Sequence, residues 1–470
     1  MRKTKIICTI GPACDDEETL RQLCLSGMNV ARLNFSHGTH EEQQVRVNRI
    51  KKIRTELNLP IALMLDTKGP EYRIKTFKDG SVSLKEGDPF TFTTRDVIGD
   101  ETIVSVSYDH LMQNLVPGDR ILLNNGLMAF RVESVSDTDA LCTVTVGGEL
   151  SNRKSMSFPN KVLDQPFLSA QDREDILFGI RNDFDYIACS FVSRKQDLLD
   201  VKEFLKENNG SFIALIAKIE NQSGIDEIES ICEECEGIMI GRGDMGVEIP
   251  YEELPAIQKH LITKCRLLGK RVITATEMLE SMITNTRPTR AEISDVANAV
   301  YDGTSAIMLS GETAAGKHPV LALQVMAKIA ETTEKTIDYA KQFRTSEFIT
   351  RDMVDSISHA TCGMAIDIKA KAIIVCSLSG MTVRMVSRFR PPVDIVGLTT
   401  NERTWRKLAL SWAVTPVMSP LLPSTEVLFY SAKLLAKDVM GLQPNDIVVI
   451  TGGVTNGQSG NTNLIKIDYV

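Results

Sequence analysis

The sequence has 470 residues, of which 43% are hydrophobic and 24% charged, and its formal net charge is -8 at pH 7. These are ordinary values for a globular protein, and at about 100 to 200 residues per domain the length predicts two to four domains. An acidic chain without a basic footprint argues against non-specific binding to nucleic acid or to an anionic membrane.

The cysteines and the amino-terminal segment indicate a cellular compartment. The opening MRKTKIICTIGPAC has too short an apolar run for a signal peptide, and no later run reaches the roughly 18 apolar residues of a membrane span. The chain has 10 cysteines, many of them inside apolar runs, as is usual for reduced cytosolic thiols. Cys232 and Cys235 form a CxxC without a second pair or a nearby histidine, so we interpret them as structural thiols. We expect a cytoplasmic protein.

Eight short apolar segments have the length and composition of parallel strands that are covered on both faces. They read TKIICTI, MNVARLNF, IALMLD, DYIACSF, FIALIAKIE, EGIMIGR, KRVITAT and SAIMLSG, beginning at Thr4, Met28, Ile61, Asp185, Phe212, Glu236, Lys270 and Ser305. Stretches with helical periodicity lie between them, and eight strand–helix units close a (β/α)8 TIM barrel. The predicted barrel comprises residues 1–69 and 169–344.

Residues 70–168 interrupt this repeat after the third strand. Segments such as TIVSVSY and DRILLNNGLMAFRVESV alternate apolar with polar residues and are separated by Gly, Asp and Pro. This pattern predicts an inserted antiparallel β domain. Because it follows the carboxyl end of a barrel strand, we expect it to act as a lid that excludes water from the active site.

The last part of the chain, residues 345–470, begins a separate α/β pattern. A helix near residues 356–368 precedes the apolar segments AIIVCSLSG, DIVGLTTN, TPVMSP, DIVVITGG and NLIKIDYV. We expect a mostly parallel sheet with helices on its faces.

Two segments match nucleotide-binding motifs in part. GRGDMG, from Gly241, follows a strand, but it places Asp244 where a pyrophosphate would bind. GETAAGK, from Gly311, resembles a P-loop, but His318 stands where Ser or Thr must coordinate magnesium, and Glu312 would repel phosphate. We interpret both as coincidental.

In a barrel of this type the chemistry lies at the carboxyl ends of the strands. The polar residues predicted there are Arg32, Asp66, Lys218, Glu220, Arg242, Asp244, Thr276 and Glu312. Glu220 and Asp244 follow neighbouring strands and suit Mg²⁺ or Mn²⁺ as ligands, with a structural ion pair as the alternative. Lys218 lies two residues before Glu220, so both side chains point to one face, where an ammonium can stabilise an enolate oxygen. Its alternative role is to pair with a barrel carboxylate.

Further candidates follow the second and third strands. Arg32 and Arg73 carry forked guanidinium groups suited to a phosphoryl group. A set of hard oxygens, the ligand type for a cation such as K⁺, accompanies them. The set comprises Asn34, Ser36, Asp66 and Thr67. Taken singly, Asn34 and Ser36 also fit turn positions.

Beyond these residues, the chain resembles the pyruvate kinase family in a series of short sequence strings. The strings occur in the same order as in that family and extend over nearly the whole chain. The strings are TKIICTIGP, NVARLNFSHG, LDTKGPEYR, AKIENQ, GIMIGRGDMGVEIP, VITATEMLESM, PTRAEISDVANAVYDGTSAIMLSGETAAGK and ITGGVTNGQSGNTN. The resemblance implies an enzyme that transfers the phosphoryl group of phosphoenolpyruvate to ADP, giving pyruvate and ATP. It also implies a cytoplasmic homotetramer of glycolysis that requires Mg²⁺ or Mn²⁺ together with K⁺.

The resemblance implies roles for individual residues. Glu220 and Asp244 become ligands of the divalent metal, and Lys218 becomes the lysine of phosphoryl transfer, with Arg73 and Thr276 also catalytic. The implied phosphoenolpyruvate ligands are Arg32, Arg73, Lys218, Gly243, Asp244 and Thr276, and the implied K⁺ ligands are Asn34, Ser36, Asp66 and Thr67. A group near Thr276 would protonate the enolate, and the residues do not identify that acid.

The sequence departs from the family pattern at several positions. Asn124 and Asn125 stand where an acidic pair is usual, Glu277 replaces Gln, Ala315 replaces Lys and Asn160 replaces Gly. These changes affect the expected charge of the lid and the contacts on the nucleotide side. Glu71 is the residue that accompanies K⁺ dependence in the family, where Lys at the same place accompanies independence.

The carboxyl-terminal domain carries a candidate effector site. The string SLSGMTVR places Ser377, Ser379, Gly380 and Thr382 between a strand and a helix, where hydroxyls and free N–H groups bind phosphate. A plain helix N-cap is the alternative. The resemblance favours a phosphorylated allosteric effector whose identity is not legible. Because the chain ends after NTNLIKIDYV, we expect no additional carboxyl-terminal domain.

Two other functions fit part of the pattern. A magnesium-dependent aldol lyase also binds an enolate on Glu and Asp ligands, but it requires neither the inserted lid nor the paired arginines. A catalytically silent sensor of phosphometabolites would keep the last domain's pocket, but it would not need Lys218, Glu220 and Asp244.

Overall fold

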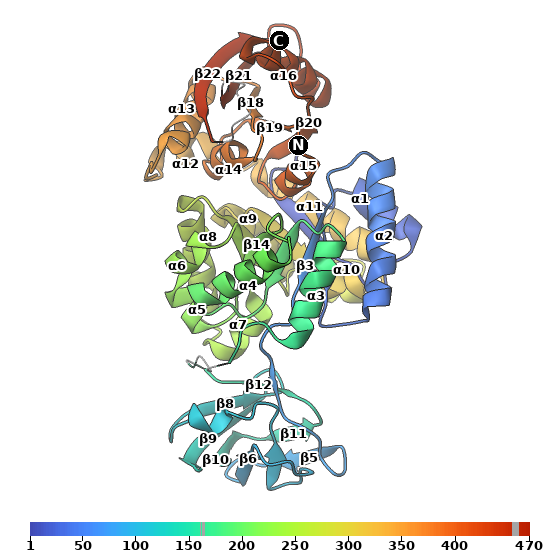
Figure 1. Ribbon diagram of the computed structural model, residues 1–470, viewed down its shortest axis with the longest axis vertical. Helices are drawn as coiled ribbons and strands as arrows, with labels where there is room; N and C mark the ends of the chain where they lie inside the picture. Colours follow the sequence, from blue (N-terminus) through green and yellow to red (C-terminus); the bar gives the residue numbers. More distant parts are fainter. Residues whose placement is uncertain (160, 162–164, 454–459) are drawn as a thin grey trace.

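The computed structural model describes residues 1–159, 161, 165–453 and 460–470. Three bodies follow one another along the long axis of the molecule (Figure 1). A closed barrel lies in the middle, the inserted β unit (residues 72–157) lies at one end, and the carboxyl-terminal unit (residues 353–469) lies at the other. The predicted fold class, a (β/α)8 barrel with an inserted β domain and a carboxyl-terminal α/β domain, is confirmed.

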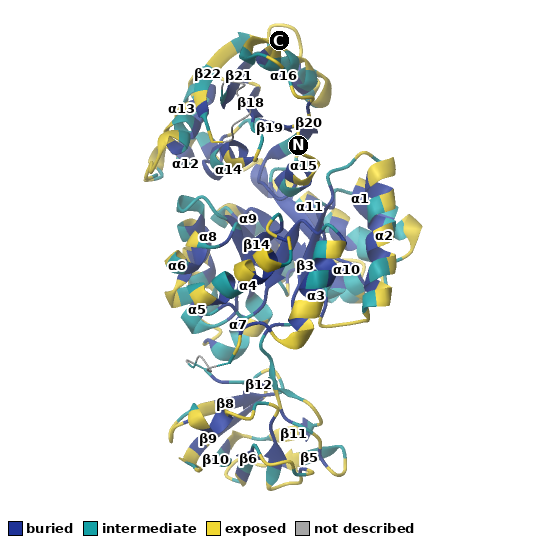
Figure 2. Cartoon of the chain, viewed as in Figure 1, coloured by how far each residue is buried: buried dark blue, intermediate teal, exposed yellow. Residues whose placement is uncertain are grey.

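All eight predicted barrel strands are present and pair in parallel in the order β1-β17-β16-β15-β14-β13-β3-β2. They are β1 (Lys5–Thr9), β2 (Val30–Asn34), β3 (Ala62–Asp66), β13 (Tyr186–Cys189), β14 (Ala214–Ile219), β15 (Gly237–Gly241), β16 (Arg271–Ala275) and β17 (Ala306–Leu309). Nearly every residue in them is buried, as expected for strands with side chains in the barrel interior on one face and helices on the other (Figure 2).

The barrel helices begin at polar caps. Thr39, Ser169 and Thr289 each accept from a backbone N–H of the first turn and form a capping box. The helices are α1 (Glu17–Leu25), α2 (His40–Glu56), α3 (Ala170–Arg181), α4 (Lys195–Glu207), α5 (Gln222–Asp226), α6 (Ile228–Glu233), α7 (Arg242–Glu248), α8 (Leu254–Leu267), α9 (Arg290–Asp302), α10 (Gly311–Ala314) and α11 (Pro319–Glu334), with the 3-10 helix η2 (Glu280–Ile283). The next helix, α12 (Tyr339–Thr345), packs on the core of the carboxyl-terminal unit (Figure 1).

The inserted unit has its own apolar core and two sheets. The larger sheet has the order β4-β12-β8-β9-β10-β6-β7, and β11 pairs with β5. The elements are β4 (Tyr72–Arg73), β5 (Ser81–Leu84), β6 (Pro89–Thr93), β7 (Ile103–Ser105), η1 (Leu111–Gln113), β8 (Arg120–Leu123), β9 (Met128–Val135), β10 (Asp139–Val146), β11 (Gly148–Ser151) and β12 (Ser155–Ser157). Neighbouring strands run antiparallel except β6 and β7, which pair in parallel.

The carboxyl-terminal unit is a five-stranded sheet of order β20-β19-β18-β21-β22 in which β22 is the antiparallel member. Helices cover the sheet. The elements are α13 (Met353–Asp367), β18 (Ala372–Cys376), α14 (Met381–Arg388), β19 (Asp394–Thr399), α15 (Glu402–Leu408), β20 (Val414–Met418), α16 (Thr425–Met440), β21 (Ile447–Gly453) and β22 (Thr462–Tyr469).

The carboxyl-terminal unit closes the amino-terminal end of the barrel. Leu410 is fully buried with the interior side chains of the barrel, and Arg406 donates to Asp185 at 2.8 Å just before β13. This junction lies at the end of the barrel opposite the inserted unit (Figure 1), which leaves the carboxyl ends of the strands facing that unit. Among the described residues, none of the helices combines the length and apolar character of a membrane crossing.

Candidate active site

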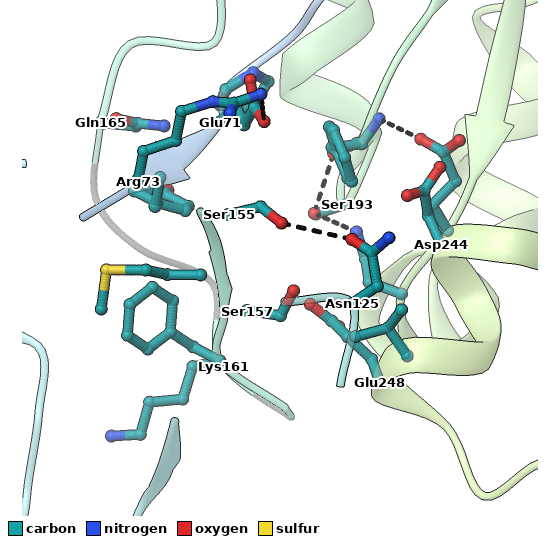
Figure 3. Close-up of a pocket in the computed structure, with 18 of the residues that line it drawn as sticks. Glu71, Arg73, Asn125, Ser155, Ser157, Lys161, Gln165, Ser193, Asp244 and Glu248 are labelled. Atoms are coloured by element: carbon teal, nitrogen blue, oxygen red, sulfur yellow. Dashed lines mark hydrogen bonds and ion pairs between the residues drawn. The ribbon is translucent and has the colours of Figure 1, made fainter. Parts of the chain in front are cut away.

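A cleft of about 360 Å³ lies between the carboxyl ends of the barrel strands and the inserted unit. Figure 3 shows Glu71 and Arg73 on one side of this cleft, Asp244 and Glu248 on the other, and Asn125 close to Ser155 between them. The barrel contributes Glu220 and residues of α7, while β4, β12 and the segments next to them contribute to the facing wall. The two predicted metal ligands, Glu220 and Asp244, therefore line one cleft together with Arg73.

A buried row of alternating charges leads from the barrel interior to this cleft. The Arg32 Nε donates to Asp66 Oδ2 at 2.7 Å, and the Lys218 Nζ lies 3.2 Å from Asp66 Oδ1. The same Nζ lies 3.1 Å from Glu220 Oε1. Residues from β2, β3 and β14 are thus joined, because the carboxyl ends of parallel strands meet at one rim.

Burial and the neighbouring charges shift the pKa values of three members of this row, Lys218, Asp66 and Glu220. Burial lowers the pKa of Lys218, but Asp66 and Glu220 outweigh it and hold that pKa above its usual range. Burial raises the pKa of Asp66, but Arg32 and Lys218 outweigh it and keep the carboxylate ionised. Burial raises the pKa of Glu220 to about 7, with Lys218 opposing the shift and Asp244 adding to it.

The two carboxylates fit a divalent cation of the hard type. Glu220 is 2% exposed and Asp244, in the first turn of α7, is exposed to solvent. Gly241 allows the close approach of α7 to Glu220, because a Cβ there would lie 2.5 Å from Glu220 Oε1. Among the described residues, no three His, Cys, Asp or Glu side chains gather as a metal cluster. A cation bound by this pair would therefore need oxygens from substrate or water.

Thr276 is held in a strained backbone conformation beside Gly243. Its φ is 68° and that of Glu277 is 54°, which is unusual for residues with a Cβ and rare for a β-branched one. Arg242 stabilises the turn by donating to the Thr276 carbonyl at 2.7 Å and to the Glu277 carbonyl at 3.1 Å. The Gly243 N–H donates to Thr276 Oγ1 at 2.8 Å, so these two predicted substrate ligands are in contact.

Arg73 is exposed on the cleft wall and already has partners. Its guanidinium forms an ion pair with Glu71 and donates to the Arg153 carbonyl at 2.7 Å. Glu71 also lies 3.4 Å from Lys68 Nζ. A carboxylate thus stands among the cations expected to bind phosphate.

The four predicted K⁺ ligands lie on two neighbouring strand ends. Asn34 and Asp66 are register partners of β2 and β3, and Thr67 follows Asp66. The Asn34 side chain accepts from the Ser36 N–H at 3.0 Å, which is also the geometry of a simple turn. The structure brings Asn34 together with Ser36 and Asp66 together with Thr67.

Sequence reasoning missed three polar residues of this region. Ser190 contacts Lys218 Nζ at 2.7 Å, and Lys154 and Glu248 line the cleft. Burial raises the pKa of Glu248 to about 8, with Glu220 and Asp244 adding to the shift. Ser190 is the second-to-last residue of the predicted strand DYIACSF, and this position near a strand end was the available signal.

Two polar strand-end residues hold the backbone rather than face the cleft. Arg242 supports Thr276, and Glu312 is buried while accepting from the Leu279 N–H at 3.0 Å and the Ser310 N–H at 2.7 Å. The interpretation of GETAAGK as something other than a P-loop agrees with this buried carboxylate.

The positions that depart from the family pattern are spread over the molecule. Asn124 and Asn125 line the cleft in left-handed conformations, with φ of 51° and 56°. Glu277 is exposed in the strained turn, and Ala315 is the C-cap residue that follows α10. Asn160 lies outside the described residues.

A second cavity, of about 460 Å³, lies in the carboxyl-terminal unit. Ser377, Ser379 and Thr382 line it, and Gly380 precedes α14 with φ 75° and without a side-chain cap. Thr382 Oγ1 lies 2.6 Å from Thr462 Oγ1 across the cavity wall. No charged side chain lines this cavity among the described residues. The four predicted effector-site residues are therefore adjacent, around the amino end of one helix.

Comparisons with known proteins agree with this geometry. Residues 1–323 match the family model "Pyruvate kinase, barrel domain" and residues 355–468 match "Pyruvate kinase, alpha/beta domain". A pyruvate kinase of Clostridium acetobutylicum is 43% identical over the full length of both chains, and one of Staphylococcus haemolyticus is 45% identical over all of this chain and 81% of its own. A crystal structure of a pyruvate kinase from Cryptosporidium parvum matches with a TM-score of 0.95 and 37% identity, covering 100% of this chain and 96% of the other. The chain therefore belongs to the pyruvate kinase family, the glycolytic transferases that move the phosphoryl group of phosphoenolpyruvate to ADP.

Proposed function

We propose that this chain performs the family reaction in the cleft between the barrel and the inserted unit. The observation that carries the proposal is the buried row Arg32–Asp66–Lys218–Glu220, which ends in the cleft that Arg73 and Asp244 also line. A charged row of this kind is costly to bury, and catalysis of phosphoryl transfer rests on such preorganised charge.

Each residue has a proposed task. Arg32 and Arg73 bind the phosphoryl group, while Gly243, Asp244 and Thr276 bind the substrate at its other end. Lys218 keeps its proton because its pKa is raised, and it donates to the enolate oxygen as the phosphoryl group leaves. We assign Thr276 to the side of the site on which the enolate carbon receives its proton from a nearby group, and its hydroxyl is held by the Gly243 N–H and the Ala275 carbonyl.

Glu220 and Asp244 would hold Mg²⁺ or Mn²⁺, which when bound supplies positive charge beside the transferring oxygens. The raised pKa of Glu220 supports this assignment. Burial makes the ionised form of this carboxylate unfavourable by itself, so a bound cation would stabilise that form strongly.

A K⁺ ion is proposed at Asn34, Ser36, Asp66 and Thr67. The support is the adjacency of these oxygen-bearing residues on β2 and β3 and the presence of Glu71 among the phosphate-binding cations. A monovalent cation offsets that negative charge.

The other parts of the proposal concern organisation and regulation. The barrel (1–69 and 169–344) carries out catalysis, the inserted domain (70–168) acts as its lid, and the carboxyl-terminal domain (345–470) binds a phosphorylated effector at Ser377, Ser379, Gly380 and Thr382. The uncapped amino end of α14 and the hydroxyl-lined cavity support that effector site.

We further propose a cytoplasmic homotetramer. The ten buried free cysteines support a reducing compartment. Exposed apolar side chains on α16 and on the edge strand β22, including Tyr430, Ile467 and Tyr469, support contacts between copies.

One assay tests the proposed reaction. Purified protein is mixed with phosphoenolpyruvate, ADP, Mg²⁺ and K⁺, and pyruvate is measured through lactate dehydrogenase. We expect full pyruvate formation only when both substrates and both cations are present. Absence of pyruvate under these conditions would contradict the proposal, and formation that is indifferent to Mg²⁺ would remove Glu220 and Asp244 from their assigned task.

A further inference from the structure

Ser190 lies between the catalytic lysine and the loop proposed to bind K⁺. It follows β13 directly and is 2% exposed. Its Oγ lies 2.7 Å from Lys218 Nζ and 2.6 Å from the Thr67 carbonyl oxygen. Its backbone N–H donates to Thr67 Oγ1 at 3.1 Å. One buried residue thus contacts both groups.

The hydrogen bonds around Ser190 have a fixed direction. A lysine ammonium only donates, so the Ser190 hydroxyl must accept from Lys218. The single hydroxyl proton is then donated either to the Thr67 carbonyl at 2.6 Å or to Asp66 Oδ1 at 3.3 Å, and the shorter contact favours Thr67. The result is a relay from ammonium to hydroxyl to carbonyl, in which each bond strengthens the next.

Among the described residues, the Lys218 ammonium has three partners, and Ser190 is the neutral one. The other two, Asp66 at 3.2 Å and Glu220 at 3.1 Å, are carboxylates. Three partners occupy the three N–H bonds, so an oxygen of the substrate must share one of them in a three-centre hydrogen bond. Sharing the N–H that points to Ser190 keeps both ion pairs of the buried ammonium, and the hydroxyl still directs that N–H while the substrate is bound.

The backbone holds Ser190 in place. Phe191 is left-handed, with φ 58°, and its N–H donates to Glu220 Oε2 at 2.9 Å. Gly69 packs so closely that a Cβ there would lie 2.9 Å from the Ser190 Cβ. Movement of the Thr67 loop would therefore be passed to Ser190 rather than absorbed.

We propose that Ser190 is a positioning residue that couples occupancy of the monovalent-cation loop at Thr67 to the orientation of the Lys218 ammonium. The inference rests on the proposed function, since it takes Lys218 and Thr67 in the roles given above. Cation binding at the loop fixes the Thr67 carbonyl, the carbonyl fixes the Ser190 hydroxyl, and the hydroxyl directs the third N–H of Lys218.

Three substitutions at position 190 test this coupling in the full-length protein. Ser190→Ala removes the hydroxyl, Ser190→Cys keeps the side-chain volume with a poor acceptor, and Ser190→Thr keeps the hydroxyl. Pyruvate formation is measured while K⁺ is varied at saturating phosphoenolpyruvate and ADP. We expect Ala and Cys to lower kcat about tenfold and to raise the K⁺ half-saturation about fivefold, because a charge-assisted hydrogen bond is lost. Thr should restore the K⁺ half-saturation to within about twofold of the unmodified value.

A matched control is Ser305→Ala at the opposite end of the barrel. Ser305 is 3% exposed, and its hydroxyl accepts from the Val272 N–H at 3.1 Å and from Arg390 at 2.9 Å. Removal of the Ser305 hydroxyl should lower the melting temperature about as much as Ser190→Ala does. It should leave kcat and the K⁺ half-saturation within about twofold of the unmodified values.

The outcomes separate the inference from the function on which it rests. If the unmodified protein makes no pyruvate, the proposed function is wrong and the roles assumed here are wrong with it. If the unmodified protein is active and Ala and Cys lower kcat with the K⁺ half-saturation unchanged, Ser190 serves Lys218 alone and the coupling is wrong. Unchanged kcat in both variants, or a K⁺ half-saturation that Thr fails to restore, would also overturn the inference. If the Ser190→Ala variant does not fold, the comparison of Ser190→Cys with Ser190→Thr tests the coupling in the same way.

Discussion

The barrel cleft and the carboxyl-terminal cavity are similar in size but use charge in opposite ways. The cleft is lined by carboxylates and cations on both walls, among them Arg73, Glu220 and Asp244. The carboxyl-terminal cavity has no charged side chain in its described lining and presents hydroxyls and the amino end of α14 instead. Both are proposed to receive phosphate.

The difference follows from what each cavity must do with the phosphate. A transferred phosphoryl group changes its charge during the reaction, so its site needs fixed charges and cations that act most strongly in the transition state. An effector is only held, and hydroxyls with free N–H groups hold an anion adequately without charging the cavity. We therefore expect substitutions in the cleft to change the rate and substitutions in the cavity to change only regulation.

The largest effect is expected from Lys218→Met. The substitution removes the buried ammonium that Asp66 and Glu220 hold in place. Loss of a preorganised donor costs roughly 3 to 4 kcal/mol, so kcat for pyruvate formation should fall by about 10² to 10³ or more. The lactate-dehydrogenase-coupled assay measures the loss, and circular dichroism checks the fold.

The matched control is Lys202→Met, which removes a half-exposed ammonium on the outer helix α4 that pairs with Glu234 at 2.6 Å. It should leave kcat within about twofold, since surface ion pairs contribute little. Near-normal turnover in Lys218→Met would contradict the proposed role of this lysine in phosphoryl transfer. The expectation that substitutions in the cleft, unlike those in the carboxyl-terminal cavity, change the rate would then lose its main support.

The next effect concerns K⁺ and Glu71. Glu71 pairs with Arg73 and lies 3.4 Å from Lys68, so it withdraws two cations from the phosphate they are expected to bind. We expect activity in tetramethylammonium buffer to be low and to rise about tenfold or more with added K⁺. Glu71→Lys should retain activity without K⁺, because it supplies the positive charge covalently.

Coupled assays at constant ionic strength measure this dependence, and Glu71→Gln serves as the control because it removes the carboxylate without adding a cation. Full activity of the unmodified protein without K⁺ or NH₄⁺ would contradict the proposed cation site.

The fold was predictable because its signal is local. Each barrel strand is a short apolar run buried on both faces, and β14 carries Lys218 toward the face where Glu220 follows, as the two-residue spacing predicts. The direction of pairing inside the inserted unit was not predictable, since an alternating pattern is the same for the parallel pair β6 and β7 as for antiparallel neighbours.

The candidate site was predictable in its charged members and not in their partners. Arg242 and Glu312 occupy strand ends as Lys218 does, yet they bind the Thr276 carbonyl and the Leu279 N–H, which belong to other segments. Ser190 escaped notice because a serine after a strand is common. Only the closed barrel shows which strand ends are neighbours.

A smaller effect is expected on metal affinity as the pH changes. The pKa of Glu220 is raised to about 7, mainly by burial, so below that pH a proton competes with the cation for this carboxylate. Mn²⁺ affinity should therefore fall up to about tenfold per pH unit below 7 and level off above about 8. Spin-probe titration between pH 5.5 and 8.5, a range set around that pKa, measures it. A flat profile would contradict the assignment of Glu220 as a ligand, and Asp244→Ala should weaken binding at every pH.

The smallest effect on catalysis, and the sharpest test of the comparison, is expected from Ser379→Glu in the carboxyl-terminal cavity. Ser379 is exposed in the turn before α14, so a longer side chain can be accommodated without disturbing the core. The new carboxylate would find no cation in the described lining and would repel an incoming phosphate at the helix end. Basal kcat should stay within about twofold, while activation by any sugar phosphate or nucleoside monophosphate that activates the unmodified protein should be lost.

Ser379→Gln has nearly the same size without the charge, so it should raise the half-saturation for the activator only a few-fold, and the difference between the two variants isolates electrostatic repulsion. Activation of Ser379→Glu with an unchanged half-saturation would place the effector elsewhere, and a loss of basal activity in both variants would mean that this cavity, like the cleft, takes part in turnover.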